Sequence, residues 1–275
     1  MKALDGSADF AGLAGVLDGR PDGRPDGRPP LVLLHGLTFD RAMWQPALAG
    51  LRETDPGRQV LALDLPGHGG SPPWPRYDLE SLAAAVHGAA TAARLTAPVV
   101  VGHSMAAVIA TVYAARYPAR GVANVDQWLW VEPSVTLVKS LAGEIREGGF
   151  AAAWEQFEQS MHMEMLPATA RELLRPASSV RQDVVAGYWR EGIDRPAADL
   201  AADVDAALAK IRANGTRYLF IAGHEVEPGY RDWLSQQLPQ ADIEVWPASG
   251  HFPQLAHPKR FTGCLAATAH WDGAA

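Results

Sequence analysis

One serine stands where a short apolar run turns directly into a helical pattern. The run VVVGHS ends at Ser104, and the helical pattern after it continues to Tyr117, just before Pro118. A strand that turns into a helix at such a serine places the hydroxyl in a tight turn at the carboxyl edge of a sheet. The start of the helix adds partial positive charge and unpaired amide groups. The pattern therefore predicts that Ser104 is a nucleophile.

Small residues on both sides of this serine let the strand and the helix approach each other. Gly102 lies two positions before Ser104, and Ala106 lies two positions after it. The usual pattern for such a nucleophile, G-x-S-x-G, has glycine at both places. Since alanine adds only a methyl group, we expect the turn to form.

A serine nucleophile of this kind needs two backbone amides that stabilise an oxyanion at the same sheet edge. We expect the first amide from Met105, the residue directly after the serine. We expect the second from Leu37, because another apolar run ends at His35 and Gly36, and glycine permits the turn.

The general base must be a histidine at the same edge, and nine histidines are available. His251 follows the last apolar run and precedes the last helical pattern, so we expect it beside Ser104. His35, His68 and His103 also end apolar runs, but they lie inside turn motifs, where we expect them to hold loops by hydrogen bonding. Candidates for substrate contact are His35, Gly36, His103, Trp128, Trp130, Trp154 and Phe252.

The acid that orients the histidine has more than one candidate. Asp126 lies 22 residues after Ser104, about one helix and one strand further along the chain. It should therefore emerge at the same edge on a neighbouring strand. Glu225 and Glu227, after the next apolar run, are the alternatives.

The elements that must position these residues are short apolar runs that alternate with helical patterns. Runs that are apolar on both faces are typical of strands in a parallel sheet between helices. The sequence therefore predicts an open α/β sheet. The runs lie at 31–36, 60–69, 99–104, 122–126, 217–223 and 243–251, and helices are expected near 79–95, 104–117, 229–238 and 258–270.

The alternation lapses for roughly ninety residues after Asp126, in a helical region rich in Trp, Met and Leu. We interpret this region, 128–209, as a helical cap or lid inserted into a core domain that comprises 1–127 and 210–275. The repeat GRPDGRPDGRPP, at 19–30, is expected to form a surface loop.

The composition argues against several other classes of protein. The net charge of −7 argues against nucleic-acid binding, and a single cysteine, Cys264, excludes an internal disulfide. HEVEP at 224–228 lacks the second histidine of a zinc motif, and neither G-x-G-x-x-G nor a P-loop is present, so no metal or cofactor is expected. No signal peptide or membrane helix is predicted. We expect a cytoplasmic monomer or homodimer that binds a small molecule and neither nucleic acid nor membrane.

Five segments together resemble the α/β-hydrolase superfamily, in order and spacing, across nearly the whole chain: LVLLHGL, LALDLPGHGGS, VVVGHSMA, ARYPARGVANVD and SGHFPQLAHPKRF. The resemblance implies an eight-stranded, mostly parallel sheet with a helical cap after strand six. It also implies the order Ser, acid, His, which corresponds to Ser104, Asp126 and His251. Many members carry their acid after strand seven, at the place of Val226 here. That difference favours Asp126.

The resemblance leaves more than one activity open. We expect a serine hydrolase that cleaves an ester or lactone of a small to medium, partly apolar substrate, because HGL and GHSMAA resemble ordinary hydrolases. The segment VDQWLWVEP resembles the cofactor-free quinolone dioxygenases, which use a His/Asp dyad to deprotonate a substrate that then reacts with O₂. Such a dioxygenase, with His251 and Asp126 as its dyad, is the alternative. A hydrolase-like protein that binds a ligand without turnover is the third.

Overall fold

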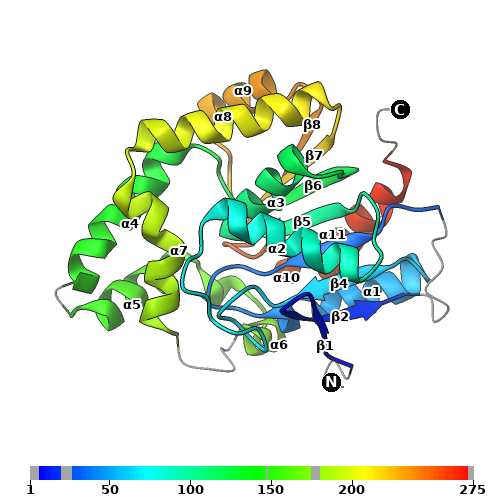
Figure 1. Ribbon diagram of the computed structural model, residues 1–275, viewed down its shortest axis with the longest axis horizontal. Helices are drawn as coiled ribbons and strands as arrows, with labels where there is room; N and C mark the ends of the chain where they lie inside the picture. Colours follow the sequence, from blue (N-terminus) through cyan, green and yellow to red (C-terminus); the bar gives the residue numbers. More distant parts are fainter. Residues whose placement is uncertain (1–5, 20–26, 147, 175–179, 272–275) are drawn as a thin grey trace.

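One eight-stranded sheet forms the centre of the protein (Figure 1). The computed structural model describes residues 6–19, 27–146, 148–174 and 180–271. The strands are Ala8–Phe10 (β1), Leu13–Asp18 (β2), Leu31–Leu34 (β3), Val60–Leu63 (β4), Val99–His103 (β5), Gly121–Val125 (β6), Arg217–Ala222 (β7) and Ala241–Val245 (β8). Their order in the sheet is β1-β2-β4-β3-β5-β6-β7-β8. β2 pairs antiparallel with β1 and β4, and every pair from β4 to β8 is parallel.

Helices cover both faces of this sheet, which explains why the central strands β3, β4, β5 and β6 are buried at every position. Helix α1 (Gln45–Thr54) packs against α11 (Pro258–Ala267), and α2 (Leu79–Ala92) packs against α3 (Met105–Arg116). The other elements of the core are η1 (Arg41–Trp44), α9 (Pro228–Gln237), α10 (Pro253–Ala256) and η3 (Thr268–His270).

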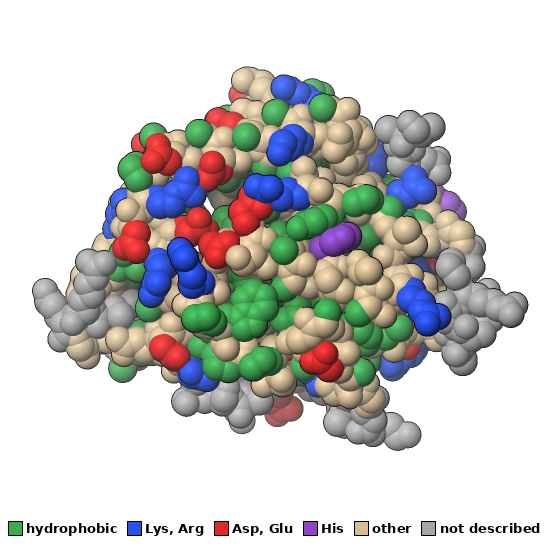
Figure 2. All heavy atoms as spheres, in the orientation of Figure 1, with side chains coloured by type: hydrophobic (Ala, Val, Ile, Leu, Met, Phe, Trp, Pro, Cys, Tyr) green, Lys and Arg blue, Asp and Glu red, His purple; other side chains and the backbone are tan. Residues whose placement is uncertain are grey.

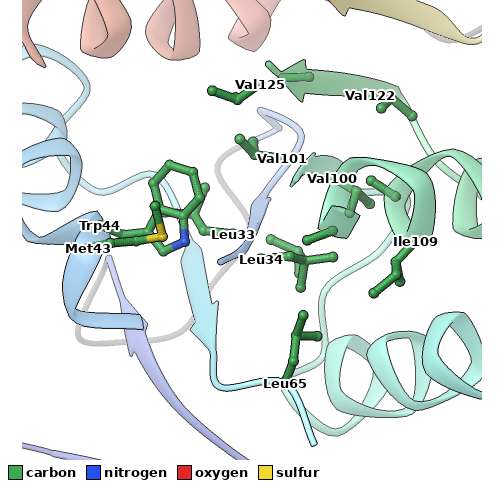
Figure 3. Close-up of a cluster of buried hydrophobic side chains, with 14 of the residues drawn as sticks. Leu33, Leu34, Met43, Trp44, Leu65, Val100, Val101, Ile109, Val122 and Val125 are labelled. Atoms are coloured by element: carbon green, nitrogen blue, oxygen red, sulfur yellow. The ribbon is translucent and has the colours of Figure 1, made fainter. Parts of the chain in front are cut away.

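Side chains of neighbouring strand positions meet different helices, as the alternation of a strand requires. Figure 3 shows Leu33 on the side of Trp44, which precedes α1, and Leu34 on the side of Ile109 in α3. All four side chains are buried. The sheet is therefore held between two apolar layers, and its carboxyl edge is left to form a site.

The segment between β6 and β7 is helical, and we call its helices from α4 to α8 the lid. They are α4 (Val131–Arg146), α5 (Phe150–Ser160), η2 (Met163–Met165), α6 (Ala168–Leu173), α7 (Gln182–Asp194) and α8 (Ala197–Ala213). Figure 1 shows α4, α5 and α7 grouped beside the sheet, and α8 returning toward α3. Helix α8 packs against both α4 and α3. The division of the chain at residues 128 and 209 stays a prediction, since α8 continues without a break to Ala213.

The predicted α/β fold is confirmed, and each of the six apolar runs overlaps one of the strands. The sequence did not reveal β1 and β2, because their hairpin lies at the sheet edge and carries polar and exposed positions. The surface loop predicted at 19–30 falls mostly on residues 20–26, which lie outside the described part. No helix in the described part is long and apolar enough to cross a membrane.

The turn between β5 and α3 leaves no room for a side chain two positions before the serine. A Cβ at Gly102 would lie 2.3 Å from the carbonyl oxygen of Ala106 and 2.5 Å from the Cα of Ala107. Ser104 itself adopts φ 53° and ψ −138°, and its amide donates to the carbonyl of Val125 in β6 at 2.9 Å. The expected turn therefore forms with alanine at position 106.

We expect Gly102→Ala to lower stability by about 3 kcal/mol or more, because the added methyl group collides with the backbone of α3. Ala106→Gly is the matched control at the other end of the turn. It should cost about 1 kcal/mol, the lower helix propensity of glycine. Thermal unfolding followed by circular dichroism measures both, and equal losses would contradict the close approach of strand and helix at Gly102.

Candidate active site

The predicted base and acid meet through one hydrogen bond at the carboxyl edge of the sheet. Asp126 directly follows β6, and His251 lies in the loop after β8. The Nδ1 of His251 lies 2.8 Å from the Oδ2 of Asp126. Because a carboxylate only accepts hydrogen bonds, Nδ1 carries the proton and Nε2 is left as an acceptor. Ser104, Asp126 and His251 all border one cavity.

Backbone and side-chain hydrogen bonds fix the turn that carries Asp126. The residue has a φ of 58°, and its amide donates to the carbonyl of Ile221 at 2.8 Å. Its Oδ1 accepts from the amide of Gly223 at 2.7 Å. The buried Asn124 accepts from the amide of Gln127 and donates to its carbonyl, at 3.0 and 2.8 Å. These hydrogen bonds therefore hold the carboxylate in its orientation toward His251 in the absence of substrate.

The carboxylate of Asp126 stays charged although its residue is only 5% exposed. Burial on its own would raise the pKa of Asp126. The hydrogen bond and charge of His251, together with the amide of Gly223, outweigh burial and hold the pKa below its usual value. A charged partner fixes the histidine tautomer and stabilises the imidazolium that forms when Nε2 takes up a proton.

The loop of His251 is held from three sides. Its amide donates to the carbonyl of Met161, in the lid, at 3.0 Å, and its carbonyl accepts from Nε2 of His103 at 2.7 Å. On the third side, a Cβ at Gly223 would lie 1.9 Å from the carbonyl oxygen of Gly250. The lid therefore contacts the base directly through the backbone.

Leu37 and Met105, the predicted sources of oxyanion donors, both border the cavity. Met105 is the first residue of α3, where amides have no partner inside the helix. The loop of Leu37 is fixed at the next residue, because the amide of Thr38 donates to Nε2 of His68 at 3.0 Å. Both positions can therefore present an amide to a negatively charged oxygen above Ser104.

Two neutral histidines tie this loop to the one after β4. His35 donates from Nδ1 to the carbonyl of Gly36 at 2.8 Å and accepts at Nε2 from the amide of Leu65 at 2.9 Å. Burial lowers the pKa of His35 to about 4. Burial, followed by the charge of His35, lowers the pKa of His68 to about 3. The two rings are therefore uncharged and hold the two loops together by hydrogen bonds, as their positions inside turn motifs predicted.

A cavity of about 550 Å³ opens over Ser104 between the core and the lid. Of the seven predicted substrate contacts, Trp128 and Trp130 border it. The other five are buried and do not border this cavity: His35, Gly36, His103, Trp154 and Phe252.

These five residues are turned inward because each supports the site from behind. His35 and His103 donate to backbone carbonyls, and a Cβ at Gly36 would lie 2.6 Å from Nδ1 of His103. Phe252 packs edge-on against Phe39, with ring centroids 5.5 Å apart. Trp154, on α5, packs against Phe157 and Trp189, which themselves border the cavity.

The alternative acids lie away from the base. Glu225 and Glu227 are exposed, and neither borders the cavity. Their neighbour His224 does border it: its Nδ1 lies 3.6 Å from Oδ1 of Asp126, and its ring stacks on Trp128 at 5.7 Å. His224 was not predicted, because the segment HEVEP was interpreted only for a metal site and for the acids Glu225 and Glu227. Its position two residues after the end of β7 was the signal.

No cluster of His, Cys, Asp and Glu side chains that could bind a metal ion is found among the residues that the structure describes. The carboxylate of Asp126 is a buried charge at the site, and the Nδ1–H of His251 donates a hydrogen bond to it. The arrangement suits proton transfer between a serine, an imidazole and a carbonyl substrate.

The sequence is similar to those of known proteins. A model of the alpha/beta hydrolase family matches residues 31–263. A pimeloyl-[acyl-carrier protein] methyl ester esterase from Chromobacterium violaceum is 29% identical over 220 residues, which cover 75% of this chain and 82% of that protein.

Two solved structures share the fold at low identity. The enol-lactonase from Burkholderia xenovorans LB400 has a TM-score of 0.67 at 22% identity, covering 96% of this chain and 99% of its own. AqDC, studied for recognition and ring cleavage of the Pseudomonas quinolone signal, has a TM-score of 0.75 at 16% identity, with the same coverage. The eight-stranded fold predicted from the resemblance is thereby confirmed.

We expect acid to destabilise the protein through its buried histidines. The unfolded chain takes up protons below the ordinary histidine pKa of 6.5, whereas the folded chain holds His68 neutral down to about 3. Stability is therefore full above about pH 6.5 and falls as the pH drops toward the folded value. In His68→Gln, which keeps an acceptor for the Thr38 amide, the loss between about pH 6.5 and 4.5 should be about 2 kcal/mol smaller.

Urea unfolding at both pH values measures this difference. His270→Gln, the same change at an exposed histidine, is the control and should keep the dependence of the wild type. An identical acid loss in His68→Gln and the wild type would show that the ring of His68 titrates normally in the folded chain.

Proposed function

Since this chain belongs to the alpha/beta hydrolase family and is a hydrolase that cleaves ester bonds, we propose that it acts through an acyl-enzyme formed on Ser104. The observation that carries the proposal is the hydrogen bond of 2.8 Å between His251 and the buried carboxylate of Asp126. It leaves the other imidazole nitrogen as the acceptor for the serine proton, in the cavity that Ser104 borders.

The reaction follows from this arrangement in two halves. Nε2 of His251 takes the proton of Ser104 while the serine oxygen attacks the ester carbonyl, and the amides of Leu37 and Met105 stabilise the oxyanion. The histidine then gives its proton to the leaving alcohol, and the acyl group stays on the serine. In the second half a water molecule takes the place of the alcohol, which releases the acid and restores the free hydroxyl.

We propose as substrate a carboxylic ester or lactone of small to medium size and partly apolar character. The bacterial relative described above is a methyl ester esterase, and one structural neighbour is an enol-lactonase. The cavity supports an apolar substrate, because Trp128, Trp130 and Leu129 border it close to the acid.

The cofactor-free dioxygenase is the second candidate, because the His251 and Asp126 pair that it would use is present. The likeness of the backbone to AqDC concerns the fold alone at 16% identity. The two candidates differ in what they require of Ser104. A hydrolase needs its hydroxyl as nucleophile, whereas a dioxygenase needs only the histidine as base.

We expect a fluorophosphonate probe to label the wild-type protein rapidly and Ser104→Ala not at all, because the probe reacts with an activated serine. Gel fluorescence and mass spectrometry of the labelled peptide locate the adduct. Equal labelling of the two proteins would contradict the nucleophile. Oxygen uptake with a hydroxyquinolone, undiminished in Ser104→Ala, would instead support the dioxygenase.

We expect Asp126→Asn to lower kcat/KM for a p-nitrophenyl ester by about 10³- to 10⁴-fold, because the amide favours the wrong histidine tautomer. Glu225→Gln and Glu227→Gln make the same chemical change at exposed positions and should stay within about twofold of the wild type. A large loss in either glutamate variant, together with full activity of Asp126→Asn, would move the acid to that glutamate.

A further inference from the structure

One face of α3 borders the cavity from the serine to the other end of the helix. Met105, Val108, Val112 and Ala115 follow one another at intervals of three and four residues, so they lie on a single face. All four are only partly buried, whereas their neighbours in α3, apart from the terminal Arg116, are fully buried in the core. The open face of the helix is therefore an apolar strip that begins next to Ser104.

The lid provides the opposite wall of this strip. Leu200, Val204 and Ala207 of α8 recur at the same helical spacing and border the same cavity. Val135 and Val138 of α4 border it as well. Since α8 packs against both α3 and α4, three helices enclose one apolar channel.

Several ion-paired side chains border the cavity at the end of the channel that is far from Ser104. Arg116, the last residue of α3, pairs with Glu80 at the start of α2. On the lid, Arg195 pairs with Glu191 at 3.2 Å and with Asp203 at 2.7 Å. Figure 2 shows the surface hollowed between α8 and the start of α2, with acidic and basic side chains around the hollow. We call these five residues the rim.

The length of the channel follows from the geometry of α3. The helix advances about 1.5 Å per residue, so the path from Ser104 to Arg116 is about 18 Å long. An extended aliphatic chain advances about 1.3 Å per carbon, so about twelve to fourteen carbons span this path.

We propose that the site takes esters with an unbranched aliphatic chain, which lies along the apolar face of α3 with its ester group at Ser104 and its free end at the rim. The inference rests on the proposed serine hydrolase. A long apolar chain gains free energy along the whole channel, whereas a polar group held between α3 and α8 would lose its hydration without finding partners. The ionic rim remains in water, where its side chains keep their hydration.

The first test is the dependence of kcat/KM on chain length in the wild-type protein. In p-nitrophenyl esters of straight acyl chains, kcat/KM should rise by up to about fourfold per added carbon and level off near twelve carbons. A second series, acetates of straight alcohols, determines whether the acyl or the alcohol part occupies the channel. A rise in either series supports the channel, and two flat series beyond four carbons overturn it.

The second test blocks the channel at two depths. Val112→Trp, about 12 Å from Ser104 along the helix, should move the preferred length to about eight carbons, and Ala115→Trp, about 16 Å from Ser104, should move it only to about eleven. Ala209→Trp adds the same side chain to an exposed position of α8 that does not border the cavity, and should keep the wild-type preference.

The outcomes separate this inference from the proposed function. If the fluorophosphonate labels Ser104 but neither tryptophan variant shortens the preferred chain, the channel is wrong and the serine mechanism stands. If Ser104 is not labelled and no ester is cleaved, both fail. Thermal unfolding checks that each variant is folded. If Val112→Trp does not fold, Ala115→Trp and the wild-type ester series still test the channel.

Discussion

A hydrogen bond between two loops at the carboxyl edge of the sheet, from Nδ1 of His251 to the carboxylate of Asp126, is the interaction on which the rest of the site depends. The partners lie 125 residues apart in the chain, and the parallel sheet brings them together because both follow strands that end at the same edge. The carboxylate keeps its charge because the amide of Gly223 also bonds to it. A buried charge of this kind is tolerated only where its hydrogen-bond partners are held in place. The close-packed strand ends hold them.

Much of this arrangement could be predicted from the sequence because the order of strands determines the edge at which their ends emerge. Each strand from β3 to β8 overlaps an apolar run, and the runs predict Ser104, Asp126 and His251 as strand-end residues. Whether a strand-end side chain borders the cavity or is buried beneath it could not be predicted in the same way. His103 and Phe252 also follow strands but turn inward to support neighbouring loops, while His224 turns toward the cavity. Which way a strand-end side chain points depends on packing between distant segments.

The lid is joined to the core at both ends of the cavity. Near the base, the carbonyl of Met161 accepts the amide of His251. Near the rim, Glu191 accepts the amide of Leu79, the first residue of α2, at 3.0 Å, while it also pairs with Arg195. A displacement of the lid at one end would therefore disturb the position of the imidazole, and at the other it would change the width of the opening. The lid therefore connects the width of the opening with the position of the His251 imidazole.

The left-handed backbone of Ser104 has a consequence for how this protein can change. A residue other than glycine with φ 53° and ψ −138° lies in a region that costs of order 1–3 kcal/mol. Glycine would relieve that strain, but it would also remove the hydroxyl. Selection for thermal robustness alone would therefore favour loss of the proposed nucleophile, and selection for turnover through it would oppose that loss. This position exemplifies a trade-off between stability and activity in which the scaffold tolerates a local defect for the sake of its reaction.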